Sequence, residues 1–120
     1  MATAADQTLT YLGDDGLVRA ITTTDDAVSV FNVPANTEKV SLLITGNPAT
    51  ILFSQASGIV NGLARPSVNT KGRLDLPVNT TIDITPRRCG VSGLAPWKIG
   101  VCTTSNGSNT TVQASLEMAP

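Results

Sequence analysis

The chain has 120 residues and an apolar content of 41%, enough for the core of one domain, but its aromatic content is only 3%. Charged residues make up 14%, well below the roughly 25% of an average protein, and the formal net charge is −1. A nearly neutral chain has no strong electrostatic attraction to nucleic acid or to an anionic membrane.

The first half of the chain contains short segments in which apolar and polar residues alternate, as in half-buried β-strands. After Glu38, the apolar residues Val40, Leu42 and Ile44 share one face, whereas Leu43 is an apolar residue on the polar face. A hairpin turn is expected at Asp25–Asp26. Strands are predicted at Thr8–Leu12, Leu17–Thr24, Ala27–Val33, the segment from Glu38, and Ala49–Gln55, the last after the turn Gly46–Asn47–Pro48.

The second half continues the same alternation. Trp97, Ile99 and Val101 share one face of a strand, so we expect Trp97 to be a core residue. Further strands are predicted at Arg73–Leu76, around Ile82 and Ile84, from Trp97 onward, and from Val112 to Met118. No segment of ten or more residues combines helical periodicity with a convincing cap.

Together these segments predict an all-β protein, an antiparallel β-sandwich or a jelly-roll-like barrel of about eight strands with no substantial helix. We expect residues 1–16 to form an N-terminal arm and residues 17–120 to form a single β-sandwich domain. The two apolar runs between Val33 and Gln55 are expected to be adjacent core strands.

One connection, Ser54–Gly72, is unusually long for a compact domain. It is expected to cross between the two sheets, to act as a binding loop, or to do both. Ile59, Val60 and Leu63 are predicted to pack beneath it as a small satellite cluster.

A turn motif occurs twice, as Pro34–Ala35–Asn36–Thr37 and as Pro77–Val78–Asn79–Thr80. Proline fixes φ near about −65°, which suits a turn, and asparagine tolerates left-handed backbone. A β-branched threonine then begins the next strand. The repeat fits two pseudo-symmetric halves of the fold or two independent uses of one good turn.

Side chains for several kinds of catalytic and metal chemistry are missing from the sequence. There is no histidine, which removes His-dependent nucleophiles and histidine metal sites, and two cysteines cannot complete a four-cysteine zinc site. We interpret Asp14–Asp15 and Asp25–Asp26 as turn residues, with calcium ligands or a carboxylate-pair hydrolase as alternatives. We expect a non-enzymatic protein without catalytic residues, metal or cofactor, and Cys89 and Cys102 as reduced thiols rather than a disulfide.

The charges are unevenly distributed along the chain. The first part is acidic, and the middle is basic through Arg65, Lys71, Arg73, Arg87, Arg88 and Lys98. This is the pattern of ordinary solvated loops or, alternatively, of complementary surfaces that meet across a subunit interface. The start of the chain lacks the basic and apolar regions of a secretory signal, and no apolar stretch reaches the ~18–20 residues of a membrane span. Synthesis in a cytoplasm is therefore expected.

Residues 27–118 contain, in order, VPANTEKVSLLITGNPATILFSQ, a long connection, RLDLPVNTTIDITP and WKIGVCTTSNGSNTTVQASLEM. This order of proline turn, strand, Asn-Pro turn, crossover, second proline turn and final strand resembles small β-sandwich virion proteins of tailed bacteriophages. The resemblance implies a structural role, most simply a capsid decoration (cement) protein that forms trimers on the outer capsid surface and stabilises the shell between capsomers.

The partners implied by this resemblance are other copies of the chain and the major capsid protein, with no nucleic acid, membrane or small-molecule substrate. The residues expected at protein interfaces are Tyr11, Leu12, Leu43, Arg65, Arg87 and Arg88. The alternative is a carbohydrate-binding, fibre or adaptor β-sandwich module, in which an exposed Trp97 would stack on a sugar.

Overall fold

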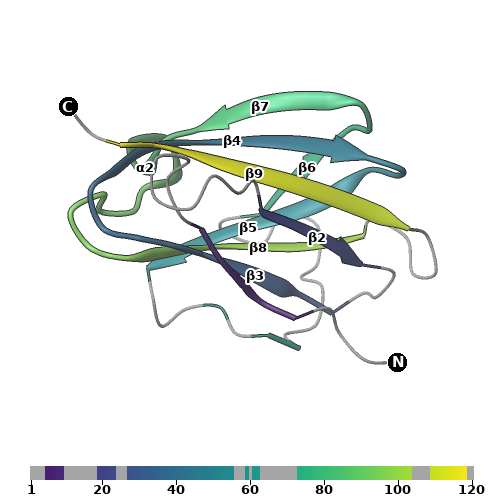
Figure 1. Ribbon diagram of the computed structural model, residues 1–120, viewed down its shortest axis with the longest axis horizontal. Coiled ribbons are helices and arrows are strands. Elements are labelled where there is room, and N and C mark those ends of the chain that lie inside the picture. Colours follow the sequence, from purple (N-terminus) through teal and green to yellow (C-terminus); the bar gives the residue numbers. More distant parts are fainter. Residues whose placement is uncertain are drawn as a thin grey trace.

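The computed structural model describes residues 5–9, 19–23, 27–55, 59, 61–62, 73–103 and 109–118. These residues form two β-sheets packed face to face (Figure 1). One sheet has five strands, in the spatial order β1 (Gln7–Thr8), β3 (Ser29–Val33), β8 (Trp97–Thr103), β5 (Ala49–Gln55) and β6 (Arg73–Leu76). The other has four strands, in the order β2 (Arg19–Thr23), β9 (Thr110–Met118), β4 (Thr37–Thr45) and β7 (Thr80–Ile84). The predicted all-β sandwich is confirmed.

The strand order is that of a jelly roll. From β2 to β9 every connection passes from one sheet to the other, except that β5 and β6 are antiparallel neighbours in the same sheet. Eight strands connected in this way form two interlocked Greek keys, which leave only short edge strands. The short β1 is an addition, paired in parallel with β3 at the edge of the five-stranded sheet.

The segment expected to be an N-terminal arm contributes to the sandwich at β1. The backbone N–H of Leu9 donates to the carbonyl oxygen of Asn32 at 2.9 Å, and the Leu9 side chain is only 2% exposed. Residues 5–9 are therefore held against the five-stranded sheet by backbone pairing and by apolar burial.

The period-two alternation of the sequence produces the main core. Val40, Leu42 and Ile44 of β4 are fully buried and face Ile99 and Val101 of the opposite sheet within one hydrophobic cluster. Trp97 is 1% exposed in the same cluster, as its phase with Ile99 predicts. Because strand side chains alternate between faces, burial of this set leaves the intervening residues on the outer face of each sheet.

Two predicted strand pairings are wrong. β2 and β3 belong to different sheets, so the segment containing Asp25–Asp26 joins the sheets and does not close a hairpin. β4 and β5 are core strands, as predicted, but they lie in opposite sheets. Alternation identifies the inward-facing residues of a strand, but sheet membership depends on pairing with strands distant in sequence.

The long connection between β5 and β6 does not cross between sheets, because these two strands are neighbours. Instead Ile59, within this connection, packs on the outer face of the five-stranded sheet and is 4% exposed. It completes a second apolar cluster, made of Val28, Val30, Leu52, Ile59 and Cys102. The predicted satellite cluster is thus confirmed for Ile59, whereas Val60 and Leu63 lie outside the described residues.

Hydrogen bonds hold the segment around Ile59, which we call the cover, against the outer face of the five-stranded sheet. One carboxylate oxygen of Asp6 accepts hydrogen bonds from the Val30 N–H and from the Asn61 side chain, both at 2.9 Å. The Gly62 N–H donates to the carbonyl oxygen of Val28 at 2.8 Å. Lys98 donates to the carbonyl oxygen of Ile59 at 3.1 Å. These bonds satisfy backbone groups beside the apolar cluster. Burial of the cluster therefore does not carry the free-energy cost of leaving those groups unpaired.

Glycine at position 100 allows the cover to lie close to the sheet. A Cβ atom there would lie 2.7 Å from Cγ1 of Val28 and 3.2 Å from Cγ2 of Ile59. The first distance is shorter than real Cβ contacts, and the branched valine side chain has little freedom to turn away. The absence of a side chain at Gly100 therefore determines how closely Ile59 packs on the sheet.

The repeated Pro-x-Asn-Thr motif forms two equivalent corners. Each carries the chain from the five-stranded to the four-stranded sheet, between β3 and β4 and between β6 and β7. Asn36 and Asn79 have positive φ angles of 64° and 59°, the left-handed conformation that the sequence predicts. The two strands that follow, β4 and β7, are antiparallel neighbours.

A single helical turn, α2 (Pro86–Cys89), follows β7. Proline occupies its start, and the Thr85 hydroxyl accepts a hydrogen bond from the Arg88 N–H at 3.1 Å. Gly90 ends the turn with φ 74°, and the Val91 N–H bonds to the carbonyl oxygen of Pro86 at 3.0 Å. These caps hold Arg87 and Arg88 at a fixed place beyond the end of β7.

Candidate interaction surfaces

Three of the six predicted interface residues are described, and they lie on two separate surfaces. Leu43 is on the outer face of the four-stranded sheet, whereas Arg87 and Arg88 are on α2 at one end of the sandwich. The other three predicted residues, Tyr11, Leu12 and Arg65, lie outside the described residues.

Leu43 occupies the middle of the outer face of the four-stranded sheet. It is half-buried, and its direct cross-strand neighbours are Thr81 on β7 and Gln113 on β9. A shallow hollow of about 260 Å³ surrounds it. The prediction that Leu43 lies on the polar face of β4 is confirmed, and part of its side chain is available for contact.

Most described side chains on this face are short, polar and uncharged. Two hydroxyl groups, of Thr22 and Thr111, form a cross-strand hydrogen bond at 2.9 Å. Such pairs stabilise a sheet without covering its surface. The uncharged side chains around Leu43 on this face are Ala20, Thr22, Ser41, Thr45, Thr81, Thr111, Gln113 and Ser115.

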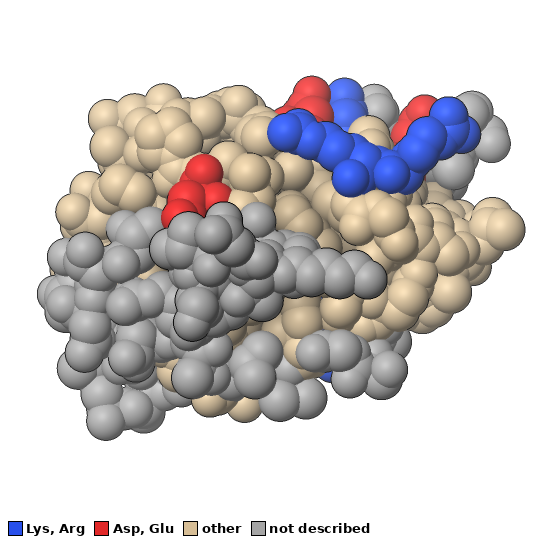
Figure 2. Space-filling model, turned by 180° about the vertical axis from the view of Figure 1, so that it is seen from behind, with Lys and Arg blue, Asp and Glu red and all other residues tan. Residues whose placement is uncertain are grey.

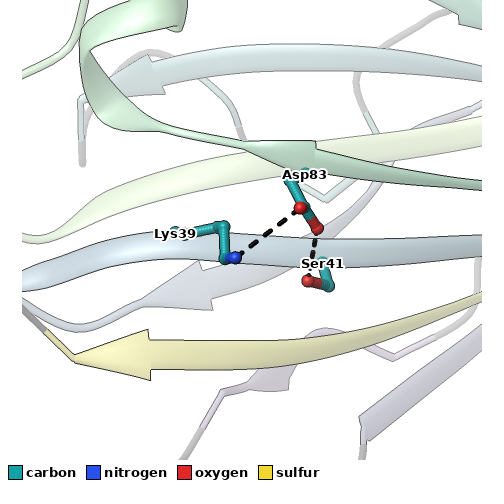
Figure 3. A network of polar contacts seen from close by, with 3 residues as sticks. All are labelled: Lys39, Ser41 and Asp83. Carbon is teal, nitrogen blue, oxygen red and sulfur yellow. Dashed lines mark hydrogen bonds and ion pairs between the residues drawn. The ribbon is translucent and has the colours of Figure 1, made fainter.

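A polar network lies at one end of the same face (Figure 3). Ser41 donates to one carboxylate oxygen of Asp83 at 2.7 Å, and the Lys39 ammonium lies 3.6 Å from the other. The hydrogen bond from Ser41 and the nearby charge of Lys39 lower the pKa of Asp83 below its ordinary 3.8. The charges of Lys39 and Asp83 balance each other, so this network adds no net charge to the face.

A second surface lies at the end of the sandwich where the β3–β4 corner, α2 and the segment after α2 meet. A groove of about 680 Å³ is present there, lined in part by Asn36, Glu38, Pro86, Arg87, Val91 and Leu94. Figure 2 shows Lys and Arg side chains gathered in one group over this end of the molecule, with acidic side chains beside them.

Arg87 is the one lining residue of this groove that was predicted at an interface, and the exposed Leu94 beside it was not predicted. Leu94 is 84% exposed and is the one large hydrophobic side chain described as exposed in the part of the chain covered by the structure. Its position between Gly93 and Pro96, in a segment without strand alternation, was a signal for a surface turn, but not for an apolar contact.

The two cysteines are free thiols in different environments, as expected. Cys102 is fully buried in the satellite cluster on the outer face of the five-stranded sheet. Cys89 is half-buried on α2, and burial raises the pKa of its thiol from 9.0 to about 11, against the opposing charge of Arg88. A thiol with so high a pKa is almost entirely protonated near neutral pH and is a poor nucleophile.

The alternative of sugar stacking on Trp97 does not fit its position, because Trp97 is 1% exposed within the core. Phe31 is also buried and Phe53 is half-buried, so none of the three aromatic side chains in the described ranges offers an open platform. Tyr11 lies outside these ranges.

The acidic pairs Asp14–Asp15 and Asp25–Asp26 also lie outside the described residues. Within the described part of the chain, no group of three or more Cys, Asp or Glu side chains is arranged to hold a metal ion. Nor does this part contain a helix with the length and apolar character needed to cross a membrane.

Comparison of the sequence with protein-family models and with curated proteins gave no match. The case for a function therefore depends on the two surfaces described above, the outer face around Leu43 and the groove beside α2.

Proposed function

We propose that this protein is a non-enzymatic structural protein of a bacteriophage particle, a capsid decoration protein that associates with itself and binds between capsomers on the outer surface of the shell. The fold is compatible with this role, because jelly rolls include viral capsid domains. They also include lectins and cupins, so the fold alone does not decide the function. The argument therefore turns on the surface of the protein.

The observation that carries the proposal is the difference between the two outer faces of the sandwich. The outer face of the five-stranded sheet is covered by Ile59 and closed by the hydrogen bonds of Asp6. The outer face of the four-stranded sheet exposes part of Leu43 among short uncharged side chains. No segment in the described part of the chain covers this second face, so we take it as the one that another protein approaches directly.

The chemistry of this uncovered face suits protein–protein contact. Burying an uncharged hydroxyl or amide against a partner that supplies a hydrogen bond costs far less than burying a charge. Short Ser and Thr side chains lose little conformational freedom when they become ordered. A single leucine near the centre, surrounded by polar groups, is the arrangement of a contact with a small apolar centre and a hydrogen-bonded surround.

The Lys39–Asp83 pair supplies orientation at the edge of the same face. Exposed ion pairs add little affinity, but a fixed positive and negative pole restricts the ways in which a charged partner can approach. The partner proposed for this face is the major capsid protein at the junction between capsomers.

The test is direct binding to shells, with the mass of the free protein measured in parallel. Shells are assembled from the major capsid protein encoded in the same genome and are sedimented with the purified protein. We expect saturable co-sedimentation, and an oligomer rather than a monomer by light scattering. A protein that is monomeric at all concentrations and stays in the supernatant would contradict the proposal.

A further inference from the structure

The groove beside α2 has pre-formed walls. The Asn36 N–H donates to the carbonyl oxygen of Gly93 at 2.7 Å, which joins the β3–β4 corner to the segment after α2. The side chain of Gln55 also binds that segment. Its Oε1 accepts from the Ser92 N–H, and its Nε2 donates to the carbonyl oxygen of Pro96 at 3.2 Å. Because these bonds are already made, a ligand entering the groove has little backbone left to order.

The groove combines an apolar floor with positive charge. Pro86, Val91 and the exposed Leu94 supply the apolar part. Arg87 lines the groove and Arg88 follows it on α2; both are exposed, and no ion pair joins either of them to another residue in the described ranges. Glu38 also lines the groove, whereas the neighbouring Lys39 is paired with Asp83. The groove therefore fits a segment with a large apolar side chain close to more than one carboxylate.

The sequence contains one such segment, Tyr11–Leu12–Gly13–Asp14–Asp15. Of the two acidic pairs in the chain, only Asp14–Asp15 closely follows adjacent large apolar residues. From Thr10 to Leu17 the chain has no basic residue, so the two acids are not neutralised by their sequence neighbours. Two carboxylates beside two guanidinium groups form the strong, directional kind of ion pair.

The strand that precedes this segment points toward the end of the sandwich that carries the groove. β1 runs parallel to β3, with Thr8 opposite Asn32, and β3 leads into the corner that forms one wall of the groove. Leu9, the last described residue before the segment, bonds to Asn32 and therefore lies near that end. A second copy that lies alongside, with this end facing the same way, can therefore reach the groove with the residues that follow its own Leu9.

We propose that the groove lined by Pro86, Arg87, Val91 and Leu94 binds the segment Tyr11–Asp15 of a second copy of this chain. Tyr11 and Leu12 cover the apolar floor, and Asp14 and Asp15 pair with Arg87 and Arg88. The contact joins two different surfaces, so repeating it about a rotation axis closes a ring, and a trimer is one such ring. This inference rests on the proposed function in its self-association, and it assigns shell binding to a different surface.

Charge reversal tests the contact. The variant Arg87→Glu/Arg88→Glu and the variant Asp14→Arg/Asp15→Arg are each expected to weaken self-association at least tenfold in sedimentation equilibrium. The chain carrying all four changes restores the opposite charges in reversed order and is expected to recover most of the association. Asn109→Glu adds a negative charge at the opposite end of the sandwich, beside Asn47, and is the matched control expected to associate like the unmodified chain.

The apolar half of the contact has its own test. Leu94→Ser removes an exposed side chain, so folding is unaffected, yet association is expected to weaken at least fivefold. Unchanged association in the reversed-charge variants overturns the inference. So does an effect on thermal unfolding without an effect on mass, which would place the segment in the groove of its own chain. If these variants lose association but still bind shells, the contact is supported and the proposed function stands. If the unmodified chain neither associates nor binds shells, the proposed function fails as well.

Discussion

The two outer faces of this sandwich are both formed by strands with alternating side chains. Among the described residues, only one of the two faces is covered by another segment of the chain. On the five-stranded sheet, Val28, Val30, Leu52 and Cys102 point outward, and Ile59 returns from the β5–β6 connection to bury them. On the four-stranded sheet Thr and Ser are the commonest outward residues, and Leu43 is the large apolar exception. In the part of the chain that the structure describes, Ile59 covers the first face and no segment covers the second.

The difference shows how to find a contact surface in a small β-sandwich. An outward-facing apolar residue does not by itself mark an interface, because the five-stranded sheet has several and the chain covers them itself. What marks Leu43 is that no described segment folds over it, so it keeps a hollow of about 260 Å³ around it. A segment that folds over the sheet must therefore be looked for before an outward-facing apolar residue is assigned to an interface.

The largest expected effect comes from removing the cover. Ile59→Ala leaves a cavity above Val28 and Leu52 and is expected to cost roughly 2–5 kcal/mol of unfolding free energy. Leu43→Ala, on the open face, is expected to cost less than about 1 kcal/mol. Urea unfolding of both variants gives the comparison. Equal losses would mean that the two faces do not differ in the way described.

The next effect concerns how closely the cover lies on the sheet. Gly100→Ala places a methyl group 2.7 Å from Val28 Cγ1 and is expected to cost about 1–3 kcal/mol. Adding Val28→Ala makes room for the new methyl group, so the double variant should be more stable than the sum of the two single losses implies. Strict additivity in chemical denaturation would show that Gly100 does not act through this contact.

A smaller effect is expected at the Pro-x-Asn-Thr corners, which connect the two sheets. Asn79 is exposed with φ 59°, and alanine there is expected to cost about 1 kcal/mol because its Cβ disfavours left-handed backbone. Asn79→Gly keeps the conformation accessible and should lie within about 0.5 kcal/mol of the unmodified chain. If both variants lose the same stability, the asparagine side chain and not the backbone angle is responsible.

The smallest effect belongs to the charged pair on the open face. The pKa of Asp83 is lowered, so its carboxylate favours the folded state at pH values above 3.8, and this contribution is lost as the pH falls through the lower pKa of the folded state. Asp83→Asn should therefore remove a small stabilisation that is present at pH 7 and already lost at the acid end, which flattens the profile between these two limits. An acid profile identical to that of the unmodified chain would mean that the Ser41 and Lys39 contacts contribute nothing.

The sequence was informative where the signal is local. Alternation placed the inward residues of β4 and β8, the Pro-x-Asn-Thr motif predicted the left-handed Asn36 and Asn79, and Ile59 was predicted beneath its loop. The failures concern long-range pairing. Nothing near Asp25–Asp26 shows that β2 pairs with β9 and not with β3. The exposure of Leu94 depends on the path of a turn held by Gln55, almost forty residues earlier.

The central claim is that the open face around Leu43, and not the covered face, binds the capsid shell. Its most direct test is co-sedimentation of Leu43→Arg with assembled shells, beside Ser54→Arg, which places the same side chain on the outer side of the five-stranded sheet. We expect Leu43→Arg to bind at least tenfold more weakly, at least about 1.4 kcal/mol, with unchanged thermal unfolding, and Ser54→Arg to bind like the unmodified chain. Full binding by Leu43→Arg, or loss of binding by Ser54→Arg alone, would contradict the claim.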